Sequence, residues 1–158
     1  MNISHALEVA RFAGVFGGFW FAFSRWDDPQ LAFRGLSVCV VVSIAGMAGI
    51  ESLFFHKRAA VASGYADPGP YQRQSGFNNL AVAIVSLVVF LLDWGTRAEA
   101  ATYLVLLVFL ALSSINHAHS RWRDGNPSWR GLTRPLGTLI LWAATLPFML
   151  RALDAVPS

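Results

Sequence analysis

The sequence predicts an all-α protein, an integral membrane bundle of five transmembrane helices in a single domain. Of its 158 residues, 55% are hydrophobic and only 13% are charged, whereas a soluble domain carries about 25% charged residues. The apolar residues form blocks of the length that crosses a bilayer, about 20 residues. The single cysteine excludes an internal disulfide framework and a cysteine zinc site. We therefore expect neither a soluble enzyme nor a secreted disulfide scaffold.

Five spans are expected, and the first is the most polar of them. They lie at residues 6–23, 36–55, 70–95, 101–119 and 136–153. The first span contains Glu8 and Arg11, which lie three residues apart on one helical face and can form an ion pair. Because no basic region precedes this span and no small-residue cleavage site follows it, we expect it to be retained.

The connections between the spans carry turn-forming residues. Asp27-Asp28-Pro29 separates the first two spans, and Asp93-Trp94-Gly95 ends the third. Asp124-Gly125-Asn126-Pro127 breaks the chain after the fourth span, as Gly and Pro clusters commonly do. The longest connection leads to Pro70. Since proline suits the first turn of a helix, we expect the third helix to begin there.

Small residues predict close contacts between helices. Gly14 and Gly18 are four residues apart on the first span, and Ala45 and Gly49 are four apart on the second. Such pairs let helix backbones approach closely in membranes. The expected partner is a neighbouring helix of the same chain, and a dimer interface is the alternative.

Basic residues are distributed unequally between the two sides of the predicted bundle. One side carries Arg11, Lys57, Arg58, Arg73, Arg121, Arg123, Arg130 and Arg134, and the other carries Arg25, Arg34, Arg97 and Arg151. Since cytoplasmic loops are enriched in Lys and Arg, we expect a cytoplasmic N-terminus and an external C-terminus. The net charge of +3 then reflects orientation and contact with anionic lipid. No nucleic-acid partner is expected.

Unusual polar residues gather at the predicted cytoplasmic ends of the spans. All four histidines lie there, together with nearly all the side-chain amides and one deep acid. Polar groups at membrane depth are costly unless they face protein or a watered cavity. The sequence therefore predicts a polar ligand-binding pocket open to the cytoplasm. Its candidate residues are Glu51, Gln74, Asn78, Asn79, Asn116 and His117.

Helical spacing limits which of these side chains can meet. Gln74 and Asn78 are four residues apart and share a face. His119 points about 200° away from His117 on the same helix, so we expect no metal site. A structural interpretation stays open as well. Amides and hydroxyls often join membrane helices through hydrogen bonds, and Glu51 can pair with a basic residue of the loop that follows it.

Several motifs within residues 50–120 resemble those of an uncharacterised family of small bacterial multi-pass proteins, domain of unknown function 6790. These motifs are Phe54-Phe55, Ala59 to Tyr65, Pro70-Tyr71-Gln72, Gly76-Phe77-Asn78-Asn79-Leu80-Ala81 and Ser114-Ile115-Asn116-His117. The resemblance implies a multi-pass fold in a bacterial inner membrane. Asn79 and His117 are the candidate residues that carry over best. Because the family has no established chemistry, the resemblance implies no activity.

The chain departs from the pattern of that family at three positions. The family tends to have a histidine near the place of Ser52, an acid near Gln74 and a proline where His56 stands. If the family uses a two-histidine or histidine-carboxylate site, this chain therefore lacks part of it.

Two classes of function are compatible with these features. The first is a non-enzymatic membrane protein, either an accessory subunit or a small-ligand-binding bundle. It fits the short loops and a sequence without a Ser-His-Asp set, a Walker loop or paired carboxylates. The alternative is a small membrane enzyme or a haem or redox protein that uses His117 as general base or axial ligand. No cofactor is specified, and the expected partners are the lipid bilayer and either other membrane subunits or a second copy.

Overall fold

The computed structural model describes residues 3–57, 69–123, 125 and 130–157, and within these ranges it contains helices and no strands. The elements are α1 (Ile3–Ser24), α2 (Pro29–Val41), the π-helical segment η1 (Val42–Gly46), α3 (Met47–Phe54), α5 (Gly69–Leu91), α6 (Thr96–Arg123) and α7 (Arg130–Asp154). Five segments are long and apolar enough to cross a membrane: His5–Ser24, Pro29–Phe54, Gln72–Leu91, Thr96–Arg123 and Gly131–Asp154. The predicted all-α class with five such helices is confirmed.

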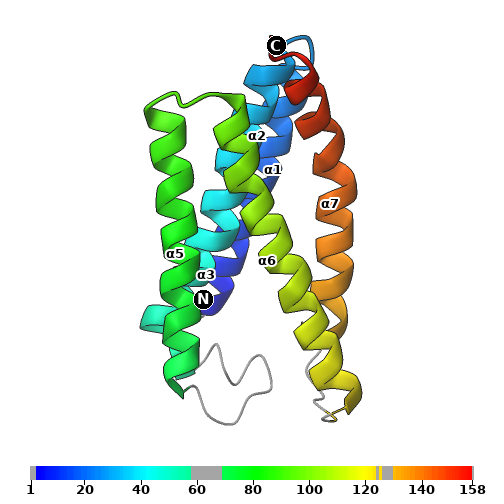
Figure 1. Cartoon of the computed structure of the whole chain (residues 1–158). Coiled ribbons are helices and arrows are strands. Elements are labelled where there is room, and N and C mark those ends of the chain that lie inside the picture. Colours follow the sequence, from blue (N-terminus) through cyan, green and yellow to red (C-terminus); the bar gives the residue numbers. More distant parts are fainter. Residues whose placement is uncertain (1–2, 58–68, 124, 126–129, 158) are drawn as a thin grey trace.

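Successive segments run in alternating directions, so the bundle has two ends (Figure 1). We call the end that holds the chain's C-terminus and the turns after α1 and α5 the C-terminal end. The N-terminal end holds the start of α1, the end of α3 and the end of α6. All four histidines belong to the N-terminal end, since they lie near the start of α1, after α3 and near the end of α6.

The second segment begins at Pro29, before the span expected at residues 36–55. Asp28 caps this helix because its Oδ1 atom accepts a hydrogen bond from the backbone N–H of Leu31 at 3.0 Å. Pro29 follows at the first helical position, where its missing N–H costs nothing. Asp28 and Pro29, which belong to the expected turn, therefore also start the helix.

A π-helical segment interrupts the second span, and the sequence analysis did not predict it. It covers Val42–Gly46 and joins α2 to α3 without a break in the chain direction. A π-bulge holds one more residue than an α-helical turn does. It therefore turns every later side chain by about 100° compared with an uninterrupted α-helix. The faces that α3 presents, including the direction of Glu51, follow from this insertion.

Glycines set the distance between the first two segments, as their spacing predicted. A Cβ added at Gly14 would lie 1.8 Å from Ser43 Oγ, and one added at Gly18 would lie 2.9 Å from Cys39 Cβ. Gly49 on the second segment lies in the same way against the backbone of α5, 3.1 Å from the carbonyl oxygen of Gly76. The predicted close contacts within one chain are thereby confirmed at Gly14, Gly18 and Gly49.

The best-packed part of the bundle lies toward the C-terminal end, where α2 packs against α6 and α7. Fully buried side chains there include Phe33, Leu36, Tyr103, Leu106 and Leu107. Toward the N-terminal end, α6 and α7 diverge from α1, α3 and α5 (Figure 1). The helices at that end pack mainly as α3 with α5 and as α6 with α7. The candidate residues are therefore carried by two separate groups of helices.

Candidate ligand-binding site

The six predicted site residues divide into three buried and three exposed side chains. Glu51, Asn79 and His117 are buried, with exposed fractions of 6%, 6% and 9%. The exposed ones are Gln74, Asn78 and Asn116. Each buried residue belongs to a different helix, namely α3, α5 and α6. A site in the interior of the bundle can therefore draw directly only on the three buried residues.

Glu51 forms an ion pair with Arg11 of α1. The Nη2 atom of Arg11 lies 3.3 Å from Oε2 of Glu51, and the two side chains are 18% and 8% exposed. Arg11 thus pairs with Glu51 across two helices instead of with Glu8 on its own helix. The Nε atom of Arg11 is buried and has no hydrogen-bond partner within the described part of the chain. The guanidinium therefore retains capacity to donate to a further acceptor.

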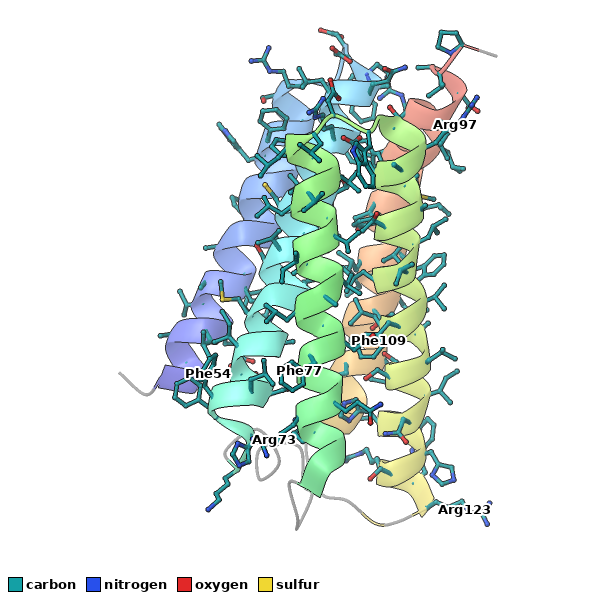
Figure 2. All side chains as sticks on the ribbon, turned by 60° about the vertical axis from the view of Figure 1, so that its left-hand side comes forward. Phe54, Arg73, Phe77, Arg97, Phe109 and Arg123 are labelled. Carbon is teal, nitrogen blue, oxygen red and sulfur yellow. The ribbon has the colours of Figure 1, made fainter. Side chains whose placement is uncertain are left out.

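Polar side chains of α5 lie next to α3, the helix that carries Glu51. The Nε2 atom of Gln72 donates to Ser52 Oγ at 3.4 Å, which links α5 to the residue after Glu51. The Nδ2 atom of Asn79 donates to the backbone carbonyl of Ser75 at 2.9 Å, one turn earlier on the same helix. Phe54 and Phe77, both labelled in Figure 2, mark where α3 and α5 run side by side at this end.

His117 belongs to the contact between α6 and α7. One turn before it, the hydroxyls of Ser114 and Thr138 form a hydrogen bond 2.8 Å long between these helices. A Cβ added at Gly131 of α7 would lie 3.3 Å from the carbonyl oxygen of His117, so the two backbones approach closely here. His117 is thus held by the α6–α7 pair, whereas Glu51 and Asn79 are held by α1, α3 and α5.

A further histidine at this end has an unused nitrogen. The Nδ1 atom of His56, two residues beyond α3, is buried and has no hydrogen-bond partner within the described residues. No group of three or more His, Cys, Asp or Glu side chains that could hold a metal ion was found among the described residues.

The sequence analysis missed a second ionic cluster, at the C-terminal end of the bundle. Arg34 of α2 pairs there with Asp93, in the turn after α5, and with Glu99 of α6. Asp93 was interpreted only as part of a turn, and Glu99 was assigned no role. Glu99 and Tyr103 are four residues apart on one face of α6, but Glu99 precedes the span expected at residues 101–119, so the predicted helix did not include it.

Comparison with known proteins yields one family and no characterised relative. The sequence profile of a family described as "Family of unknown function (DUF6790)" matches residues 12–156. The match extends well beyond residues 50–120, where the resemblance was noted. No curated protein and no solved structure matches the chain.

Proposed function

The chain belongs to the family of unknown function DUF6790, and from the geometry of its own residues we propose that it is a non-enzymatic inner-membrane protein that binds a small polar ligand at the N-terminal end of the bundle. The observation that carries the proposal is the partly buried Arg11–Glu51 ion pair. Ionisable residues inside spanning helices are rare and commonly belong to functional sites, because placing a charge at membrane depth is costly.

The pair suits recognition because it combines charge with unused hydrogen-bonding capacity. A guanidinium has five N–H donors, and the buried Nε of Arg11 has no partner among the described residues. A ligand with a carboxylate, phosphate or carbonyl oxygen would satisfy this donor. We assign the first contact with the ligand to Arg11, and to Glu51 the role of holding the guanidinium in place.

The other buried candidates extend the proposed site across the divergence of the helices. Asn79 belongs to α5 and His117 to α6, two helices that diverge toward this end of the bundle (Figure 1). A ligand bound between them would bridge the two groups of helices. The exposed Gln74, Asn78 and Asn116 would then line the approach to the site and not its interior.

Binding is favoured over catalysis by the contacts of Glu51, a buried acid at this end. A general base must present its carboxylate to a substrate proton, whereas Oε2 of Glu51 already contacts Arg11. The alternative, a haem or redox protein, would use His117 as axial ligand. It differs from the proposal in one direct observable, a visible absorption band that depends on His117.

We also propose that the N-terminal end faces the cytoplasm of a bacterial cell. Arg73 and Arg123 lie at this end, and Arg97 lies at the opposite one (Figure 2). The larger number of basic residues at the N-terminal end supports this orientation, since cytoplasmic loops retain Lys and Arg. In this orientation the ligand would enter from the cytoplasm.

The experiment is purification of the full chain in mild detergent, followed by native mass spectrometry and an absorption spectrum. We expect a bound small molecule in the wild type that is lost in Arg11→Gln and in Glu51→Gln. Arg25→Gln is the matched control, because Arg25 directly follows the same helix and is exposed. Equal retention in all variants, or a ligand-free wild type whose melting temperature responds to no polar metabolite, would overturn the proposal.

A second candidate function, accessory subunit of a membrane complex, is favoured by the exposure of α1. In its most apolar stretch 11% of the residues are buried, against 28–56% in the other four spans. Its outward face carries Phe12, Phe16 and Trp20, which are 69%, 74% and 73% exposed. Ala13 and Gly17 lie on the same face, and small residues spaced in this way favour helix contacts in membranes.

The accessory role is tested with a glycine that has a matched control. Added Cβ atoms at Gly17 of α1 and Gly137 of α7 would each meet nothing within 4 Å. We expect Gly17→Leu to abolish chemical cross-linking to a partner in native membranes, and Gly137→Leu to leave it intact. Absence of any cross-linked partner in the wild type would argue against this role.

A further inference from the structure

The ionic cluster at the C-terminal end is centred on Arg34, which contacts three polar groups. The Nη1 atom of Arg34 contacts Oδ1 of Asp93, and its Nη2 atom donates to the carbonyl of Phe90 at 2.8 Å. Its Nε atom lies 3.5 Å from Oε1 of Glu99. The guanidinium also lies over the ring of Phe90, 5.0 Å from its centroid. Arg34 thereby ties α2 to the end of α5 and the start of α6.

The two carboxylates around Arg34 differ sharply in their exposure and in their contacts. The side chain of Asp93 is 70% exposed, whereas that of Glu99 is 4% exposed. Oε1 of Glu99 is buried and has no hydrogen-bond partner within the described residues. The hydrogen bonds of Arg34 go to Asp93 and Phe90 instead. The contact of Arg34 with the buried carboxyl of Glu99 is therefore weaker than its hydrogen bonds to Asp93 and Phe90.

Tyr103, one turn further along α6, is a second buried polar group beside the cluster. Its side chain is fully buried, and its hydroxyl lies beside Thr145 of α7. Its ring packs edge-on against Phe33 of α2 at a centroid distance of 5.7 Å. Because helical side chains lean toward the preceding turn, the Tyr103 side chain leans toward the turn that carries Glu99.

The charges that face Glu99 can be counted element by element within the described residues. α2 contributes Arg34, and the turn after α5 contributes Asp93. On α7 the neutral Thr145 lies beside Tyr103, is fully buried and donates to the carbonyl of Leu141 at 2.8 Å. One guanidinium thus faces two carboxyl groups. If both were ionised, solvent would stabilise the charge of the exposed Asp93, whereas the buried carboxylate of Glu99 would depend on a guanidinium that it shares, and a buried charge with incomplete compensation is unfavourable.

We propose that Glu99 is a proton-binding site opening to the C-terminal end, where Arg34 exchanges between Asp93 and Glu99 as Glu99 gains or loses the proton. With the proton bound, the cluster is neutral and Arg34 rests on Asp93 and Phe90, as in this structure. When the proton leaves the Glu99 carboxyl for the aqueous side, the carboxylate attracts the guanidinium inward. The N-terminus of α6 favours the anion, which keeps the proton exchangeable.

The test is infrared difference spectroscopy of the full chain in lipid nanodiscs, between roughly pH 4 and pH 9. We expect a carbonyl-stretch band of a protonated carboxylic acid that disappears as the pH rises. The band should be lost in Glu99→Gln and unchanged in the control Glu8→Gln. If no such band appears in the wild type, or if it persists in Glu99→Gln, the proposal is overturned.

A second variant keeps the test decisive if Glu99→Gln fails to fold. Asp93→Asn removes the competing carboxylate from an exposed turn, so Arg34 becomes free to pair with Glu99. At a fixed pH the protonated band should then weaken, and an unchanged band would contradict the exchange of Arg34. The result is independent of ligand binding by Arg11 and Glu51, which lie at the other end of the bundle.

Discussion

Two deep glutamates, Glu51 and Glu99, each face an arginine from another helix, but the two contacts differ in quality. Arg11 contacts Glu51 at 3.3 Å, whereas the hydrogen bonds of Arg34 go to Asp93 and Phe90, so that Glu99 keeps a buried oxygen without one. In a low-dielectric interior, breaking such a pair costs more than the pair itself contributes, because the remaining charge stays buried. The first contact is therefore suited to holding a geometry, and the second to exchanging a proton.

The Arg11–Glu51 contact predicts non-additive effects on stability. We expect Arg11→Met and Glu51→Gln each to lower the free energy of unfolding by about 3 kcal/mol, because each removes one charge of a partly buried ion pair. The double variant should lose about 1–3 kcal/mol less than the sum of the single losses. Reversible unfolding in mixed micelles measures this difference. Strict additivity would mean that the two side chains do not interact.

The cap of α2 predicts a smaller effect. Asp28→Ala removes the acceptor for the Leu31 N–H and should cost about 1 kcal/mol. Asp28→Asn should retain most of the stability, since its side-chain oxygen can still accept. Thermal unfolding of the two variants compares them directly, and equal losses would show that charge and not capping matters at this position.

Among the elements, α1 contacts the second segment through a glycine-bearing face and contacts Phe148 of α7 through Phe19 and Phe23. Gly14 and Gly18 press against Ser43 and Cys39, and Ser43 belongs to the π-helical segment. The opposite face of α1 is exposed. Since the Arg11–Glu51 ion pair also joins α1 to α3, this one contact surface positions the proposed binding residue.

Two glycines on α1 give a matched test of that surface. Gly14→Ala places a Cβ 1.8 Å from Ser43 Oγ and 2.8 Å from Ser43 Cβ, so the overpacking should destabilise by about 1–3 kcal/mol. At Gly17 an added Cβ meets nothing within 4 Å. Gly17→Ala should therefore be neutral or stabilising by up to about 1 kcal/mol, through helix propensity. Unfolding curves that rank these variants in the opposite order would refute the packing of α1.

For the whole molecule, the two ends of the bundle carry different chemistry. The N-terminal end has the histidines, the Arg11–Glu51 pair and the diverging helices, while the C-terminal end has the tighter core and the Arg34 cluster. The compartment that each end faces therefore determines which solutes and protons can reach the two proposed sites. In the proposed orientation, with the N-terminal end in the cytoplasm, the proposed ligand would come from inside and the proton from outside.

The orientation predicts the behaviour of fusions to the C-terminus of the full chain. Alkaline phosphatase, which is active only outside the cytoplasm, should be active when attached after Ser158. Green fluorescent protein attached at the same position and exported in unfolded form should stay dark. The reverse pair of results would invert the topology and move the proposed ligand site to the external face.

The sequence alone determined the class of fold, the number of spans and the gathering of histidines at one end. These features depend on the length and polarity of contiguous segments. The thickness of the bilayer sets the length of a spanning helix, and the cost of polar groups at membrane depth restricts where polar residues lie along it. The family match, over residues 12–156, agrees with the resemblance seen in Asn79, His117 and the motifs around them.

Only the tertiary structure decided which polar residues meet. Helical spacing predicted that Arg11 can pair with Glu8, whereas in the structure Arg11 pairs with Glu51. It likewise joins Arg34 to Asp93 and Glu99 from two other elements. Such contacts depend on the rotation of each helix about its axis and on its neighbours. A single inserted residue, as in the π-helical segment Val42–Gly46, turns all later side chains by about 100°. The hydrophobic pattern of a whole span does not reveal such an insertion, because the pattern is read over several turns.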